Sequence, residues 1–157
     1  MDLKELYQDI ILEHGKSPRN LGKCEGYNHD AKGYNPLCGD KVHIYLKLDA
    51  KKKVESLTFE GEGCAISLAS ASIMTELVKG KSFKETKEIM NAFLNMIKNN
   101  YELQSKHLDD DQKTKLMSLS GVKQFPMRVK CATLSWHTLV SALKGKKKEV
   151  NTEETDR

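Results

Sequence analysis

Apolar residues in the first fifteen positions recur with the three- and four-residue spacing of an amphipathic helix. The glycine at position 15 is a common helix stop. The pattern therefore predicts a first helix that buries one stripe of side chains, made of Leu3, Leu6, Tyr7, Ile10, Ile11 and His14.

Two later segments alternate between apolar and polar residues, as half-buried strands do. They are residues 42–48 and residues 54–59, separated by a polar turn at 49–53, and together they predict a hairpin. Residues 15–39 are rich in Gly, Asn, Pro and Lys and predict loops with one irregular strand at most. Glycines follow the hairpin and predict a flexible corner just before Cys64.

Helical patterns dominate the rest of the chain. One helix is expected over 66–77, and Ser82 with Glu85 forms a capping box that starts another. A short helix is expected over 113–119, and Pro126 introduces a last one that carries an apolar stripe around Trp136. The order of helix, strands and several helices predicts an α+β fold in which a small antiparallel sheet packs against the helices.

Composition narrows the class of protein. The chain has 157 residues, 38% of them hydrophobic and 31% charged, which suits a single globular domain, placed at residues 1–143. Residues 144–157 are almost all polar or charged and are expected to form a disordered tail. A net charge of +4 and the lack of a long apolar run argue against nucleic-acid and membrane partners, and the N-terminus lacks a secretory pattern. We therefore expect a cytoplasmic protein.

A cytoplasmic location changes the interpretation of the four cysteines, Cys24, Cys38, Cys64 and Cys131. Disulfides are rare in a reducing compartment, so metal binding, thiol chemistry and simple burial are the alternatives. No Cys-x-x-Cys pair is present, so the usual zinc-ribbon signature is missing.

Three of these cysteines lie at predicted element ends, where side chains distant in sequence can converge. Cys38 is in a turn before a strand, Cys64 is at a helix start, and Cys131 is near the start of the last helix. Asp40 follows Cys38 by two residues, so an extended backbone would direct both side chains the same way. Three thiolates and a carboxylate suit zinc, although thiolates also bind iron–sulfur clusters.

Simpler interpretations exist for several of these residues. Cys24 is expected to be a small buried hydrophobic residue, and Asp40 could serve only as a turn residue. No histidine has a partner at metal-ligand spacing, so His14, His43 and His137 are expected to be structural or solvated.

Three stretches of this sequence resemble the U-type (IscU/NifU-like) iron–sulfur cluster assembly family, and within it the SufU branch. They are Asn35–Asp40 (NPLCGD), Gly61–Ser67 (GEGCAIS) with the ASAS that follows, and Phe125–Trp136 (FPMRVKCATLSW). In the IscU-type scaffolds a histidine precedes the third cysteine, whereas this chain has Lys130, whose ammonium group cannot bind a metal. The connector between Ile97 and Gly121 also resembles an insertion of the SufU branch.

This resemblance implies a SufU/IscU-like fold and a zinc ion bound by Cys38, Asp40, Cys64 and Cys131. It also implies a SufS-type cysteine desulfurase as partner, with downstream iron–sulfur assembly proteins. The implied activity is that of a zinc-dependent sulfurtransferase in which Cys38 accepts persulfide sulfur. The alternatives are a scaffold that holds a transient iron–sulfur cluster and a purely structural zinc domain. Arg128 and Lys130, beside the third cysteine, either stabilise the thiolates or are ordinary surface charges.

Overall fold

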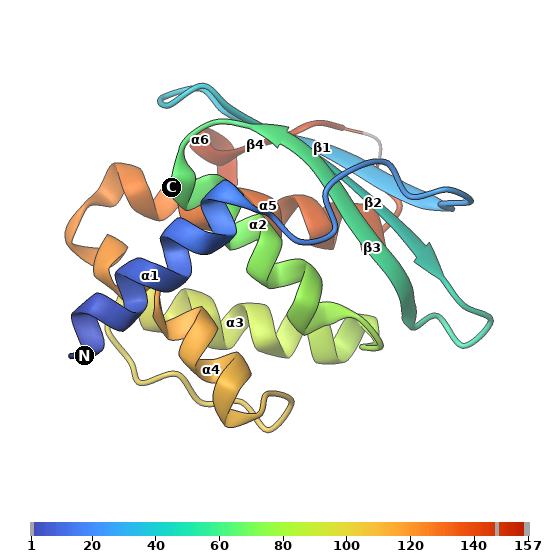
Figure 1. Ribbon diagram of the computed structural model, residues 1–157. Helices are drawn as coiled ribbons and strands as arrows, with labels where there is room; N and C mark the ends of the chain where they lie inside the picture. Colours follow the sequence, from blue (N-terminus) through green and yellow to red (C-terminus); the bar gives the residue numbers. More distant parts are fainter. Residues whose placement is uncertain (1, 147, 156–157) are drawn as a thin grey trace.

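A computed structural model describes residues 2–146 and 148–155 of the chain. Figure 1 shows a sheet with the main helices gathered on one side of it. In chain order the elements are α1 (Leu3–Lys16), β1 (His29–Asn35), β2 (Asp40–Leu48), β3 (Val54–Glu62), α2 (Ala65–Val78), α3 (Phe83–Asn99), α4 (Asp110–Met117), the 3-10 helix η1 (Ser120–Gln124), α5 (Pro126–Leu143), β4 (Val150–Asn151) and α6 (Thr152–Thr155).

The sheet has the strand order β3-β2-β1-β4. Strands β1, β2 and β3 form an antiparallel meander, and the two-residue β4 adds to the free edge of β1 in parallel. Inward-facing positions of β2 are Asp40, Val42, Ile44 and Leu46, all buried. The alternation predicted for the hairpin is thus confirmed, and it extends to a carboxylate at the start of β2.

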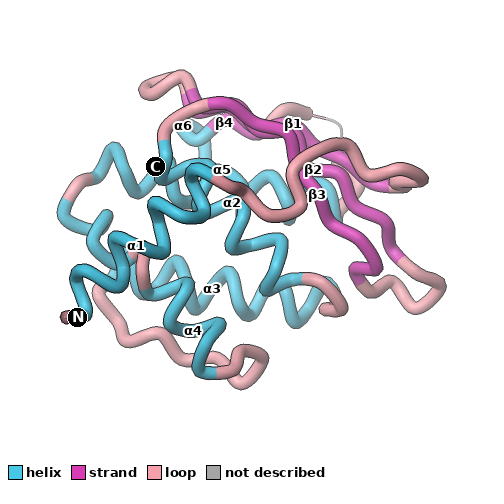
Figure 2. Tube along the Cα trace, viewed as in Figure 1, coloured by secondary structure: helices cyan, strands magenta, loops and turns pink. Residues whose placement is uncertain are grey.

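Helices α2 and α5 cover the inner face of the sheet, and α3 packs on the far side of α5 (Figure 2). Trp136 on α5 is fully buried and lies against Phe93 of α3, with 5.3 Å between the ring centroids. Its indole Nε1–H donates to Ser70 Oγ of α2, and the Ser70 hydroxyl donates to the carbonyl of Ala132. The α+β class and the apolar stripe around Trp136 are both as predicted, and so is the capping box of Ser82 and Glu85.

Helix α1 is fastened to α2 through a buried histidine. His14 is only 2% exposed, and its Nδ1 lies 2.7 Å from the hydroxyl oxygen of Ser72. That oxygen also accepts a hydrogen bond from the Arg19 backbone N–H. Burial lowers the pKa of His14, which favours the neutral ring. The structural role expected for His14 is confirmed.

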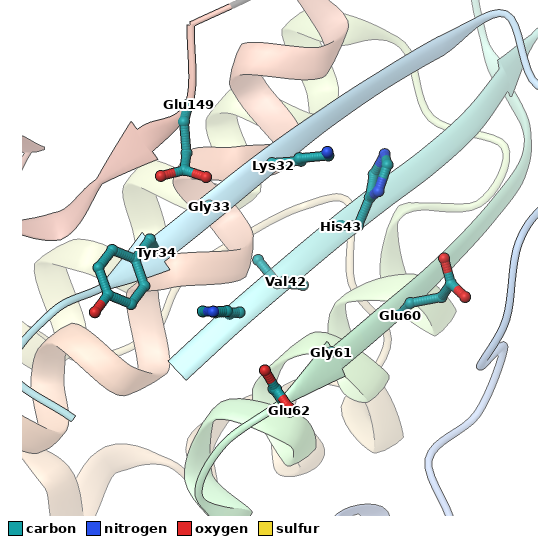
Figure 3. A pocket seen from close by; sticks show the side chains of 10 residues that line it. Lys32, Gly33, Tyr34, Val42, His43, Glu60, Gly61, Glu62 and Glu149 are labelled. Atoms are coloured by element: carbon teal, nitrogen blue, oxygen red, sulfur yellow. The ribbon is translucent and has the colours of Figure 1, made fainter. Parts of the chain in front are cut away.

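The outer face of the sheet is polar. In Figure 3 Lys32 of β1, His43 of β2 and Glu60 of β3 lie on neighbouring strands of this face. His43 Nε2 is 2.7 Å from the Asp30 carboxylate, and the Tyr45 hydroxyl donates to Glu60. These side chains point away from the helices, and they take no part in the cysteine cluster on the inner face.

Two segments differ from what the sequence predicted. Residues 29–35 form a regular strand, where the sequence had predicted loops with one irregular strand at most. The pattern is weak because the inward positions are Ala31, Gly33 and Asn35, a small and polar set without an apolar signal. The tail expected to be disordered from 144 onward includes β4 and α6, and Thr152 is fully buried there. Ladder bonds and polar side-chain contacts order this segment, and neither produces a hydrophobic pattern. Residues 147, 156 and 157 of the predicted tail lie outside the described residues.

Within the described part of the chain, no helix combines the length and the apolar character needed to cross a bilayer.

Helix α5 approaches β1 closely because position 33 has no side chain. A Cβ built on Gly33 would lie 2.1 Å from Thr138 Oγ1 and 3.0 Å from Leu134 Cδ1 of α5. Real Cβ atoms do not come so near, so any larger residue would push the helix away from the strand.

We expect Gly33→Ala to destabilise the protein by about 1–3 kcal/mol, because the added methyl overpacks the contact between β1 and α5. Urea denaturation measures the loss. Gly121→Ala, where a Cβ meets nothing within 4 Å, is the matched control. Adding Thr138→Ala to Gly33→Ala should restore part of the stability, and failure of that rescue would show that the contact is not the cause.

Candidate metal centre

The centre begins at the closed end of the β1–β2 hairpin. Asn35 ends β1 and Asp40 begins β2, and they are paired directly across the two strands with both side chains fully buried. The four residues between them form the turn, and Cys38 is the third of these, half-buried. Cys38 and Asp40 therefore come together because Cys38 lies in the turn that leads into β2. The sequence had suggested instead that an extended backbone would direct both side chains the same way.

Asp40 joins the hairpin to the start of α2. Its Oδ1 accepts the backbone N–H of Cys64, the N-cap residue of α2, at 3.0 Å. Gly63 makes this possible, since a Cβ at that position would lie 2.2 Å from Asp40 Oδ1 and its φ of +146° is in the region that favours glycine. The glycine before Cys64 thus allows another group to approach closely, and that group is the Asp40 carboxylate.

Helix α5 brings the third cysteine to the same place. The ligand atoms of Cys38, Asp40 and Cys131 all lie within 4.8 Å of one another, a spacing at which one metal ion could contact all three. Cys64 lies outside this trio, but its thiol interacts directly with that of Cys131. The structure therefore gathers three of the four predicted ligands tightly and places the fourth beside them.

The neighbouring thiols of Cys64 and Cys131 differ in pKa. The hydrogen bond from Cys131, with help from the backbone amides of Ser67 and Ile66, lowers the pKa of Cys64 to about 6. The same bond raises the pKa of Cys131, and burial acts in the same direction. Without a metal, Cys64 is therefore the thiolate of this pair at neutral pH and Cys131 the thiol.

The two cations next to Cys131 have different surroundings. Arg128, one turn earlier on α5, has a raised pKa because it lies beside the thiol groups of Cys64 and Cys131, and Cys64 is the charged one of this pair. Lys130 instead forms a salt bridge with Glu153 of α6, with 2.7 Å between Nζ and Oε1. Of the two roles considered for these residues, charge stabilisation of the thiols fits Arg128, and Lys130 contacts the C-terminal helix.

A residue of the centre that the sequence analysis did not single out is Asn35. Its Nδ2 donates to Asp40 Oδ2 at 3.2 Å and lies 3.7 Å from Cys131 Sγ, so one amide contacts two of the clustered groups. The available signal was its place as the first residue of the Asn35–Asp40 motif. The Asn35 side chain is hydrogen-bonded to Thr152, which lies in the polar tail. No pattern in the sequence indicated Thr152.

Cys24 does not belong to the centre. It is 7% exposed, and its thiol lies 3.7 Å from the carbonyl oxygen of Glu25. This agrees with the prediction of a small buried side chain. All four cysteines are free thiols, so none is lost to a disulfide.

The chemistry of the clustered donors fits zinc. Thiolates and a carboxylate are ordinary zinc ligands, and a buried carboxylate without a cation is unfavourable. Asp40 has hydrogen bonds from Asn35 and from the Cys64 amide, which fix its orientation as outer contacts do for metal ligands. A cation bound among Cys38, Asp40 and Cys131 would supply the compensating charge.

Comparison with known proteins identifies relatives over most of the chain. The family model described as NifU-like N terminal domain matches residues 6–145. The zinc-dependent sulfurtransferase SufU of Bacillus subtilis is 41% identical over 139 residues, which cover 88% of this chain and 89% of that protein. The iron–sulfur cluster assembly scaffold protein IscU of Streptococcus pyogenes is 36% identical and covers 90% of this chain and 85% of its own.

Solved structures share the fold. A crystal structure from Fervidobacterium islandicum, described as an iron–sulfur cluster assembly scaffold protein for the SUF system, superposes with a TM-score of 0.76. It is 36% identical, and the match covers 88% of this chain and 97% of that one. The N-terminal NifU-like protein of Brucella abortus superposes with a TM-score of 0.79 at 22% identity and supports the fold alone. The SufU/IscU-like fold expected from the sequence is confirmed.

We expect alkylation of Cys64 in metal-free protein to rise with pH around a midpoint of about 6, because Cys131 stabilises its thiolate. Iodoacetamide labelling across a pH series, read by peptide mass spectrometry, measures the midpoint. Cys131→Ala removes the hydrogen bond and should move the midpoint up toward the ordinary cysteine value of roughly 8.5. A midpoint near that ordinary value in the wild-type protein would contradict the thiol–thiolate pair.

Proposed function

The chain belongs to the family of NifU-like N-terminal domains, and we propose that within it the protein is a zinc-dependent sulfurtransferase for iron–sulfur cluster assembly. In this role it accepts persulfide sulfur from a SufS-type cysteine desulfurase and passes it to downstream assembly proteins. Four free thiols suit the reducing cytoplasm that the sequence predicted. The named activity of the Bacillus subtilis relative supports the proposal.

The observation that carries this proposal is the unequal exposure of the clustered thiols. Cys131 is fully buried, whereas Cys38 is half-buried in a surface turn next to Leu37, which is 52% exposed. A persulfide on another protein could therefore reach Cys38 but not Cys131. Cys64 is also half-buried, but it lies at the N-cap of α2 with its thiol paired to that of Cys131, whereas Cys38 lies in the surface turn.

The residues that would hold zinc are Cys38, Asp40, Cys64 and Cys131. When bound there, zinc keeps its cysteine ligands deprotonated and protects them from oxidation. Asn35 and the Cys64 amide orient the Asp40 carboxylate, and Arg128 lies where its charge stabilises the thiolates of Cys64 and Cys131.

Sulfur transfer then needs only thiol–disulfide exchange chemistry. The Cys38 thiolate attacks the outer sulfur of the desulfurase persulfide and forms a new sulfur–sulfur bond. The bond between that sulfur and the desulfurase cysteine breaks, and its electron pair leaves with the desulfurase cysteine as a thiolate. The products are a Cys38 persulfide and a free desulfurase thiol, so no external oxidant or reductant is consumed.

A scaffold role is the second candidate, because the Streptococcus pyogenes relative is named as one and thiolates can bind iron. Lys130 weighs against it. At the position where the IscU-type scaffolds have a histidine, this chain has an ammonium group that is paired with Glu153 and has no lone pair to give. A structural zinc domain is disfavoured for another reason, since a half-buried ligand on a surface turn leaves the site accessible.

We expect Cys38→Ala to abolish sulfur acceptance, because the nucleophile is lost. Mass spectrometry after incubation with desulfurase and free cysteine should find one added sulfur atom on wild-type Cys38 and none in the variant. Cys24→Ala is the matched control and should accept sulfur normally, since Cys24 lies outside the centre. Undiminished transfer by Cys38→Ala would assign the acceptor role to another residue.

We also expect protein purified without reconstitution to contain about one zinc per chain. Chelation should remove the ability to stimulate the desulfurase, and zinc addition should restore it. Asp40→Ala should retain little zinc, because a ligand that is oriented by two hydrogen bonds is lost. A stable iron–sulfur cluster in the purified protein, delivered intact to an apo-acceptor, would instead support the scaffold role.

A further inference from the structure

The C-terminal segment of residues 148–155, here called the C-terminal clip, lies beside the metal centre. Its strand β4 pairs with the edge of β1, Val150 opposite Gly33 and Asn151 opposite Tyr34. Figure 1 shows β4 and α6 alongside β1 and α5, the two elements that carry Asn35 and Cys131. The next residue of β1 after this pairing is Asn35, so the strand pairing between β4 and β1 ends at the metal centre.

One buried hydrogen bond connects the clip to the centre. Thr152 is fully buried, and its hydroxyl donates to Asn35 Oδ1 at 3.1 Å. The oxygen end of the Asn35 amide is thereby held away from the cluster, and its two N–H groups face Asp40 and Cys131. The reverse orientation would place the amide oxygen against a carboxylate oxygen, which repels it.

The clip is also attached to α5. Glu153, the residue after Thr152, forms the salt bridge with Lys130, the residue before Cys131. Consecutive residues of the clip thus contact the hairpin that carries Asp40 and the helix that carries Cys131. Hydrogen-bonded partners of this kind fix the orientation of metal ligands and account for part of the affinity of a site.

We propose that Thr152 and Asn35 are positioning residues for the centre. In this proposal the C-terminal clip sets the metal affinity of the centre by fixing the positions of Asp40 and Cys131 relative to each other. This inference rests on the zinc site of the proposed function but not on sulfur transfer. Thr152 donates its hydroxyl to Asn35, which is not one of the proposed metal ligands, so its effect passes through the Asn35 amide.

The test compares Thr152→Val, which keeps the side-chain shape and removes the hydroxyl, with Thr152→Ser, which keeps the hydroxyl. Glu154→Gln is the matched control on the same clip, because Glu154 faces the exposed Lys148. Zinc affinity is measured on the full-length protein by competition with a chromophoric chelator. In parallel, the rate of Cys131 alkylation is followed in metal-free protein. This rate reports how well the centre shields Cys131 from solvent, independently of zinc.

We expect Thr152→Val to weaken zinc binding roughly tenfold and to speed alkylation of Cys131, with Thr152→Ser and Glu154→Gln close to wild type. Equal losses in the Val and Ser variants would overturn the proposal, because packing rather than the hydroxyl would then matter. A lower unfolding temperature with unchanged affinity and alkylation would also overturn it. A wild-type protein that binds zinc but accepts no sulfur would refute the proposed function and leave this result intact.

Discussion

The buried carboxylate of Asp40 is the constraint around which the functional end of this protein is organised. A charge with no solvent contact must be compensated, and each of its oxygens accepts a hydrogen bond, one from the Cys64 amide and one from Asn35. Those two bonds fix the start of α2 against the end of the β1–β2 hairpin. Bound zinc would supply the remaining compensation, so the same interactions that make the carboxylate tolerable in the apo-protein prepare it as a ligand.

The centre combines a rigid interior with an accessible edge. Cys131 belongs to the helical core, which the contacts of Trp136 and Ser70 hold together, and it has no route to a partner protein. Cys38 belongs to a turn beside an exposed leucine. A sulfur carrier needs both properties, because ligands that do not move retain the metal while one reachable thiol exchanges sulfur. Relatives named as a sulfurtransferase and as a scaffold belong to this family, and in this chain Lys130 and Thr152 add contacts beside the clustered ligands.

Much of the secondary structure could be predicted because it depends on local patterns in the sequence. Short stretches of sequence are enough to indicate the capping box at Ser82, the alternation along β2 and the stripe around Trp136. Strand β1 and the C-terminal clip could not be predicted this way. Their inward residues are small or polar, and cross-strand and hydrogen-bond partners far away in the chain order them. Asn35 and Thr152, separated by 117 positions, illustrate why no local window could pair them.

The sequence by itself determined the chemistry available to the protein: three cysteines and an aspartate at element ends, in motifs that resemble one family. Tertiary structure decided how those groups differ from one another. It buried Cys131 and left Cys38 in reach, paired Cys64 with Cys131, turned Lys130 toward Glu153 and brought a polar tail back to the centre. The physical reason is that residue type sets which bonds a group can make, whereas exposure, pKa and orientation come from neighbours that only folding brings together.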